Sequence, residues 1–196
     1  MIVFIDRQHA GKPNKLDDRG ASVDVDGDGK IDLEAIITAR IAIQLEQFLM
    51  LQGHHVMPIS DGTYKQRHAR VNEYAAMYPN EICIYLAMHL NAGGGTYGAF
   101  FHHHQSTNGA KLADHIGHCM MQNNIDISDC KTIAAHPEGW TKNAFYTIRG
   151  VGRPVALCCE PVFMDSPRGN LDNLTVTRIA DAIAAGIHAY YLEIKQ

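Results

Sequence analysis

The sequence has no long hydrophobic run, no excess of positive charge and no paired set of cysteines. No apolar stretch approaches the ~18 residues of a membrane span, and the net charge of -4 provides no basic surface for nucleic acid or an anionic membrane. The five cysteines are odd in number and lack zinc-ribbon spacing, so we expect reduced thiols that pack as small hydrophobic side chains. These absences predict no membrane insertion and no nucleic-acid partner, and no feature indicates a protein partner.

No internal repeat, linker or low-complexity tract divides the chain. We therefore predict that residues 1–196 form a single domain, large enough to bury a core without disulfide or metal support. The first residues enter an apolar run directly, without the basic region and hydrophobic segment of a secretory signal. This start predicts synthesis in the cytoplasm without a signal peptide.

Short apolar runs alternate along the chain with helical patterns. The strand-like runs span about residues 2–5, 54–59, 82–87, 97–103 and 155–159. The helical patterns span about residues 33–52, 65–78, 112–120 and 176–190, and residues 123–153 show no clear pattern. Uninterrupted apolar strands are typical of a sheet buried on both faces. The alternation predicts an α/β fold, in which a single domain has a twisted, mostly parallel central sheet flanked by helices on both faces.

Three residues that can hold a metal or move a proton follow predicted strands: His9, His89 and Glu160. Chemistry in open α/β sheets gathers outside the carboxyl ends of the strands, so we expect these side chains to meet in one cleft. A catalytic zinc keeps three protein ligands and one open position, and two histidines with a glutamate are a common set. Glu34, at the start of the first predicted helix, can complete this set, whereas Glu46 lies about three turns further along.

Six segments, in order along the chain, resemble the motifs of one enzyme family. They are Ile5-Asp6-Arg7-Gln8-His9-Ala10-Gly11, Glu34 through Leu51-Gln52-Gly53-His54-His55-Val56, Arg70-Val71-Asn72, Ala87-Met88-His89-Leu90-Asn91-Ala92, Cys159-Glu160-Pro161-Val162-Phe163-Met164-Asp165-Ser166 and the closing residues 178–187. Together they resemble the zinc-dependent N-acetylmuramoyl-L-alanine amidases of the amidase-3 type, found in bacterial cell-wall remodelling and in phage lysins. Two departures stand out: Arg7-Gln8 replaces a Pro-Gly pair, and Pro161-Val162 replaces Leu-Gly.

The resemblance implies that His9, Glu34 and His89 bind Zn²⁺ and that Glu160 is the catalytic acid–base residue. The implied reaction is hydrolysis of the amide between N-acetylmuramic acid and L-alanine in peptidoglycan. The absence of wall-binding repeats and of a signal favours a phage endolysin-like catalytic domain that acts on the cell wall after release by another protein. Two alternatives remain: another zinc amide hydrolase or carboxypeptidase on the same fold, and a calcium-binding, non-catalytic wall-binding module.

Several further residues allow two interpretations each. Asn91 can contact the substrate peptide or hold its own loop, and Arg149 can meet an acidic stem-peptide group, although a surface position is favoured. His102, His103 and His104 lie in a predicted strand, where at most two side chains share a face, so packing or surface roles are favoured over a second zinc site.

An acidic loop, Asp24–Asp32, matches the opening of a calcium-binding loop, with oxygen ligands at its first, third, fifth and ninth positions and glycine at its sixth. The twelfth position falls on Ala35, so the bidentate glutamate of such loops is missing. A solvated Asp-Gly turn is the favoured interpretation and Ca²⁺ binding is the alternative.

Overall fold

Strands and helices alternate along most of the chain in the computed structural model, which describes residues 1–9, 20–166 and 171–195. In chain order the elements are β1 (Ile2–Arg7), β2 (Ser22–Val23), β3 (Asp32–Leu33), α1 (Glu34–Leu51), β4 (His55–Ile59), α2 (Tyr64–Met77), β5 (Cys83–Met88), β6 (Gly98–His103), α3 (Thr107–Gln122), β7 (Cys130–Ala135), α4 (Lys142–Ile148), β8 (Val155–Glu160) and α5 (Asn173–Ile194).

The central sheet has six strands in the order β4-β1-β5-β8-β6-β7. Strands β4, β1, β5 and β8 are parallel, whereas β6 runs antiparallel to β8 and pairs in parallel with β7. Strand β4 contains Pro58, which lacks a backbone N–H, and it lies at the edge of the sheet. The prediction of a mostly parallel central sheet is confirmed.

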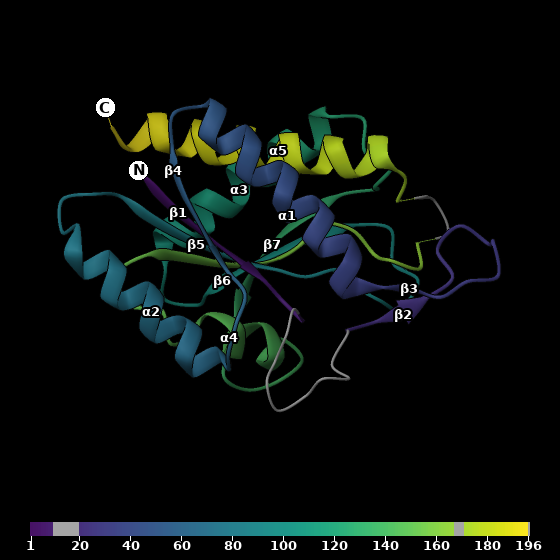
Figure 1. Ribbon diagram of the computed structural model, residues 1–196, viewed down its shortest axis with the longest axis horizontal. Helices are drawn as coiled ribbons and strands as arrows, with labels where there is room; N and C mark the ends of the chain where they lie inside the picture. The colour runs from purple at the N-terminus through teal and green to yellow at the C-terminus, as the bar shows by residue number, and fades with distance from the viewer. Residues whose placement is uncertain (10–19, 167–170, 196) are drawn as a thin grey trace.

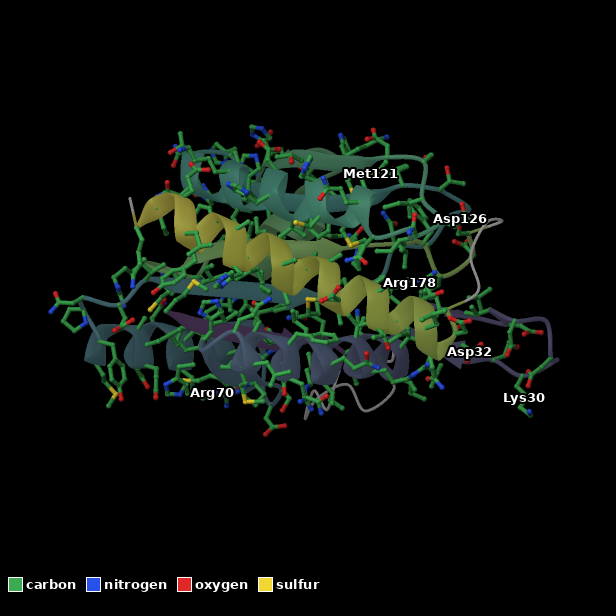
Figure 2. The ribbon with its side chains drawn as sticks, turned by 90° about the horizontal axis from the view of Figure 1, so that it is seen from above. Lys30, Asp32, Arg70, Met121, Asp126 and Arg178 are labelled. Atoms are coloured by element: carbon green, nitrogen blue, oxygen red, sulfur yellow. The ribbon has the colours of Figure 1, made fainter. Side chains whose placement is uncertain are left out.

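Helices cover both faces of this sheet, as predicted (Figure 1). Helices α1, α3 and α5 pack on one face, over a core that includes Val3, Leu86 and Leu157. Helices α2 and α4 cover the opposite face, whose core includes Phe4 and Tyr85. Viewed from above, α5 lies between α1 and α3 (Figure 2).

The cysteines behave as the sequence predicts. All five are free, and the adjacent pair in β8 faces opposite sides of the sheet: Cys158 packs in the core under α2 and α4, and Cys159 in the core under α1, α3 and α5. Burial raises the pKa of the Cys158 thiol well above its usual value, which keeps it protonated and unreactive. None of the described helices is long and apolar enough to cross a membrane.

The sequence patterns missed elements in two regions. Residues 123–153, which gave no clear pattern, contain β7 and the short helix α4. The polar stretch before the first long helix contains β2 and β3, a two-stranded antiparallel pair in which Ser22 lies opposite Leu33. This small pair matters for the site, because β3 ends immediately before Glu34, the first residue of α1.

Candidate active site

The carboxyl ends of β1 and β5 bring His9 and His89 to the same edge of the sheet. The two strands are neighbours in parallel, with Arg7 opposite Met88, so each histidine lies one or two residues beyond the paired region. His9 adopts a positive φ of 60°, which is uncommon for a residue with a Cβ. Helix α1 starts beside this edge and supplies Glu34 from its first turn.

The ring nitrogens of these histidines converge on one oxygen of Glu34. His9 Nε2 lies 3.1 Å from His89 Nδ1 and 3.3 Å from Glu34 Oε1, and His89 Nδ1 lies 3.1 Å from the same oxygen. The Glu34 side chain is 5% exposed, and those of His9 and His89 are 14% and 12% exposed, so the cluster is shielded but reachable.

The size of this triangle fits a tetrahedral zinc ion. Zinc binds nitrogen and oxygen at about 2.0–2.1 Å, which puts neighbouring ligand atoms about 3.3 Å apart in a tetrahedron. The three observed separations of 3.1–3.3 Å match this value. Two neutral imidazoles and a carboxylate also form a donor set that suits zinc and leave a fourth position for water or substrate. The residues therefore fit the metal that the sequence predicted.

The Glu34 carboxylate is oriented by two backbone groups. Its Oε2 accepts a hydrogen bond from the N–H of Ala21 at 2.8 Å, and its Oε1 accepts one from the N–H of Leu90 at 3.0 Å. Burial alone would raise the pKa of Glu34, but the contacts with His89 and His9 outweigh it and hold the pKa well below its usual range. Glu34 is therefore ionised and positioned as a metal ligand must be.

Gly20 also shapes this position, and the sequence analysis did not single it out. It adopts a φ of +75°, and a Cβ there would lie 2.4 Å from Glu34 Oε2. A glycine is therefore needed for the chain to pass close to the carboxylate. The sequence around Gly20 does not predict this contact, because the contact is with Glu34, 14 positions later in the chain.

Glu160, at the end of β8, lies beside His89. The register of β5 and β8 places Met88 opposite Cys159, and the N–H of His89 donates to the carbonyl of Cys159 at 2.9 Å. Because Cys158 faces the core under α2 and α4, Glu160, two residues later, faces the same side. Burial, with a smaller contribution from the negative charge of Glu34, raises the pKa of Glu160 to about 7. It is thus a carboxyl group that exchanges a proton near neutrality.

A second set of buried groups supports the site from below. Asp6 on β1 forms an ion pair with Arg67 of α2 at 2.5 Å and accepts a hydrogen bond from the Tyr85 hydroxyl of β5. The network ties a helix to two central strands, directly under the ends that carry the histidines. Sequence reasoning did not identify Arg67, since one arginine on a helix usually faces solvent.

Arg7-Gln8 replaces the Pro-Gly pair of the motif that this segment resembles, and the structure explains part of this difference. Arg7 makes a bidentate ion pair with Glu46 of α1, with its Nη2 2.7 Å from Oε2 and 2.8 Å from Oε1. Glu46, set aside above as a zinc ligand, thus fixes α1 against the end of β1. Gln8 is fully buried, and its amide atoms have no hydrogen-bond partner among the residues that the structure describes. Ala10 and Gly11 of the same motif lie outside the described residues.

Asn91 holds its own loop. Its Oδ1 accepts a hydrogen bond from the N–H of Ala92, and its backbone bridges the segment after β8 through Val162 and Met164. These contacts support the structural interpretation, and a contact between Asn91 and substrate stays a prediction. Arg149 is exposed, as favoured, and its guanidinium carbon lies 4.1 Å from the centroid of the Tyr146 ring.

The histidine run forms no second metal centre among the described residues. His102 is buried, and the rings of His103 and His104 stack with centroids 4.5 Å apart. The His104 ring also stacks on His136. The only groups of three potential ligands that converge within the described ranges are the His9 cluster and Asp24 with Asp26 and Asp28.

The acidic loop extends away from the body of the molecule, with Lys30 at its tip (Figure 2). Its carboxylates accept hydrogen bonds from the loop itself: Asp24 binds the N–H groups of Gly27 and Gly29, and Asp28 pairs with Lys30 at 2.7 Å. These contacts are those of a solvated Asp-Gly turn. Calcium binding at this loop stays a prediction without support from the structure.

Solved structures show where this fold occurs. The structure superposes on the N-acetylmuramoyl-L-alanine amidase AmiC2 of Nostoc punctiforme with a TM-score of 0.72, at 21% sequence identity, over 98% of this chain and 97% of that one. An N-acetylmuramoyl-L-alanine amidase from Clostridium difficile 630 gives a TM-score of 0.72 at 20% identity, over 100% and 98% of the two chains. This chain has the fold of the N-acetylmuramoyl-L-alanine amidases.

The fold also occurs in an endolysin. The catalytic domain of the CD27L endolysin, which targets Clostridia difficile, has a TM-score of 0.62 at 20% identity, with 96% of this chain and 97% of that chain covered. No protein-family model and no curated protein matches the sequence. The likeness therefore lies in the amidase fold, and the case for an activity depends on the residues of the site.

Proposed function

We propose that this protein is a zinc-dependent N-acetylmuramoyl-L-alanine amidase that cleaves the amide between N-acetylmuramic acid and L-alanine in peptidoglycan. The observation that carries the proposal is the triangle of His9 Nε2, His89 Nδ1 and Glu34 Oε1 beside a carboxyl group, Glu160, whose pKa lies near 7. The amidase fold supports the choice of substrate.

The positions of the residues support the following proposed roles. His9, Glu34 and His89 would hold the metal, which when bound polarises the scissile carbonyl and lowers the pKa of a water toward ~7. Glu160 takes a proton from the attacking water as the new C–O bond forms. It then gives that proton to the leaving nitrogen of L-alanine as the C–N bond breaks, so that one carboxyl group serves in turn as base and acid. Burial raises the pKa of Glu160 above that of an ordinary carboxyl group, which favours release of the proton to the leaving nitrogen after its uptake.

The site of action follows from the substrate. We propose that the protein acts on the bacterial cell wall as an endolysin-like enzyme, because its proposed substrate is part of the wall.

Digestion of purified peptidoglycan tests the proposal. The protein with zinc should release peptides with new N-terminal L-alanine, and mass spectrometry should find glycan strands with unsubstituted lactyl groups. A zinc carboxypeptidase would instead release a C-terminal amino acid, and a wall-binding module would release nothing. Either of these two outcomes contradicts the assignment. Treatment with a chelator, followed by zinc, provides the control for the metal.

A further inference from the structure

A cavity of about 720 Å³ lies between α2 and the end of α4, outside the candidate active site. It is lined by polar, aromatic and basic residues, namely Thr63, Tyr64, Lys65, His68, Ala69, Asn72, Tyr146, Arg149 and Gly150. Figure 1 shows these two helices on the same side of the sheet, and the hydrogen bonds below join them directly.

The walls of the cavity are fixed by hydrogen bonds to the backbone. The ring Nε2 of His68 on α2 lies 2.8 Å from the carbonyl of Thr147 on α4. Asn72, one turn further along α2, donates to the carbonyl of Gly150 and accepts from the N–H of Gly152, each at 2.8 Å. A side chain at Gly150 would collide with His68, because a Cβ there would lie 2.4 Å from its Nδ1. The cavity is therefore preformed, and a ligand would not have to order it.

The charge in the cavity is positive. Lys65 and Arg149 contribute it, and none of the described residues that line the cavity is acidic. Neither cation forms an ion pair with a described residue, whereas Lys30 and Lys111 do. The guanidinium carbon of Arg149 lies 4.1 Å from the centroid of the Tyr146 ring, a cation–π contact with the face of the ring that leaves the N–H groups available to an anion. Thr63 and Gln66 already cap the first turn of α2. The attraction for an anion therefore comes from the side chains of Lys65 and Arg149.

The cavity lies on the same sheet face as Glu160 and His89. The ring of His68 packs 5.6 Å from that of Tyr85 on β5, and Tyr85 belongs to the core under α2 and α4. Tyr85 precedes His89 by four residues, or roughly 13 Å of strand. Tyr85 is fully buried, so a peptide would pass over the surface, and at about 3.3–3.6 Å per extended residue it needs at least three or four residues to bridge this separation.

We infer that this cavity binds a carboxylate on the peptide part of the substrate, three or four residues beyond the amide that is cut. The inference rests on the proposed function and goes further, because it assigns the enzyme a preference for substrates with a free carboxylate at that distance. Arg149 would bind the carboxylate through its N–H edge and Lys65 would add a second positive charge.

A binding experiment tests the cavity without relying on catalysis. A free tetrapeptide of the stem type, with its carboxylates intact, is titrated calorimetrically into wild type, Lys65→Gln, Arg149→Gln and Lys142→Gln. Lys142 lies at the start of α4 and does not line the cavity, although its ammonium lies 5.8 Å from the centroid of the Tyr146 ring, so its replacement removes a nearby positive charge from outside the cavity. Each cavity variant should weaken binding about tenfold or more, as expected for loss of a charge-assisted hydrogen bond. Lys142→Gln should match wild type.

A kinetic experiment then connects the cavity to the reaction. Wild type is compared on a soluble muramoyl tetrapeptide and on the same compound with its carboxylates converted to amides. KM should be about tenfold lower for the acid form, and Arg149→Gln should lose this discrimination while Lys142→Gln keeps it. Lys65 and Arg149 are both exposed, so we expect their variants to fold. The melting temperature of each variant checks this. Each variant tests the cavity independently of the other.

The two proposals fail in different ways. Hydrolysis without any preference for the acid form, in wild type and variants alike, overturns the cavity assignment and leaves the amidase intact. Carboxylate-dependent peptide binding without hydrolysis supports the cavity assignment and overturns the proposed amidase activity. Inorganic phosphate is titrated as a third ligand, and binding as tight as that of the peptide would make the cavity a general anion site and overturn the peptide assignment.

Discussion

At the scale of single residues, the proposed catalytic role of Glu160 can be tested separately from metal binding, because three other residues already supply the protein ligands of an open zinc site. Glu160→Gln keeps the shape of the side chain but removes its ability to take a proton. We expect activity on peptidoglycan to fall by about 10²–10⁴-fold, the usual contribution of a general acid–base group. Zinc content, measured by elemental analysis, should stay at the wild-type level. Loss of zinc in this variant would instead make Glu160 a ligand.

His54 predicts a pH dependence of stability. It is buried, with its Nε2 3.0 Å from Nδ1 of His188 on α5, and burial, with the charges of His188 and the N-terminus, lowers its pKa to about 4. The unfolded chain takes up a proton near pH 6.5 and the folded chain only near pH 4, so His54 destabilises the fold progressively as pH falls through that window.

Urea unfolding of the apo protein at pH 7, 5.5 and 4.5 measures this effect. His54→Gln should lose less stability than wild type between pH 7 and 4.5. His55→Gln is the matched control, because the neighbouring His55 is exposed, and it should follow wild type. Equal losses in all three proteins would mean that His54 is protonated in the folded state.

The residues of the candidate site show what a sequence pattern can and cannot predict. His9 and His89 follow predicted strands and Glu34 begins a predicted helix, and the structure brings their ligand atoms within 3.3 Å of one another. The end of a strand is a local property, so a linear pattern reveals it. Gly20 and Arg67 depend on contacts with residues distant in sequence, and no local pattern encodes those contacts.

At the scale of elements, the direction of β6 was not predicted. Apolar runs indicate a strand but carry no information about its direction. The connection from β5 to β6 contains no helix, and a parallel return usually needs one. Strand β7 follows β6 through α3 and is parallel to it, as this rule requires. Helix α4 has only seven residues, too few to establish a helical period in a sequence.

The contact between α3 and α5 is close enough to require glycine. A Cβ at Gly186 would lie 2.4 Å from the Cα of Ile116 and 2.9 Å from the carbonyl oxygen of His115, so the two helices would have to separate. We expect Gly186→Ala to lower the free energy of unfolding by about 1–3 kcal/mol, despite the better helix propensity of alanine. Urea denaturation measures the change.

Gly117 of α3 provides the comparison for this test. A Cβ there would meet only the Cβ of Cys130, at 3.2 Å, a contact that a shift of a few tenths of an ångström relieves. Gly117→Ala gains helix propensity worth about 1 kcal/mol, so its stability should stay close to or above that of wild type. If Gly186→Ala were as stable as Gly117→Ala, α3 and α5 would be less closely packed than the structure indicates.

At the scale of the whole molecule, the proposed metal would connect parts of the chain that are far apart in sequence. His9 follows β1, Glu34 begins α1 and His89 follows β5, so one ion would hold two central strands and a long helix together. A ligand that binds only the folded state stabilises it by about 2.7 kcal/mol at a hundred times its Kd. For a chain of this length, that corresponds to a rise of roughly 5–10 °C in melting temperature.

Calorimetry of the apo and zinc-loaded protein tests this expectation. Zinc should raise the melting temperature of wild type by about that amount, in one transition if residues 1–196 form the single domain that the sequence predicts. His89→Ala removes a ligand and should abolish the shift. Asp26→Ala changes the other converging group of carboxylates, in the exposed acidic loop, and should retain the shift in full. A shift that survives His89→Ala but disappears in Asp26→Ala would place the metal in the acidic loop, and would leave the histidines and Glu34 without the role that their geometry suggests.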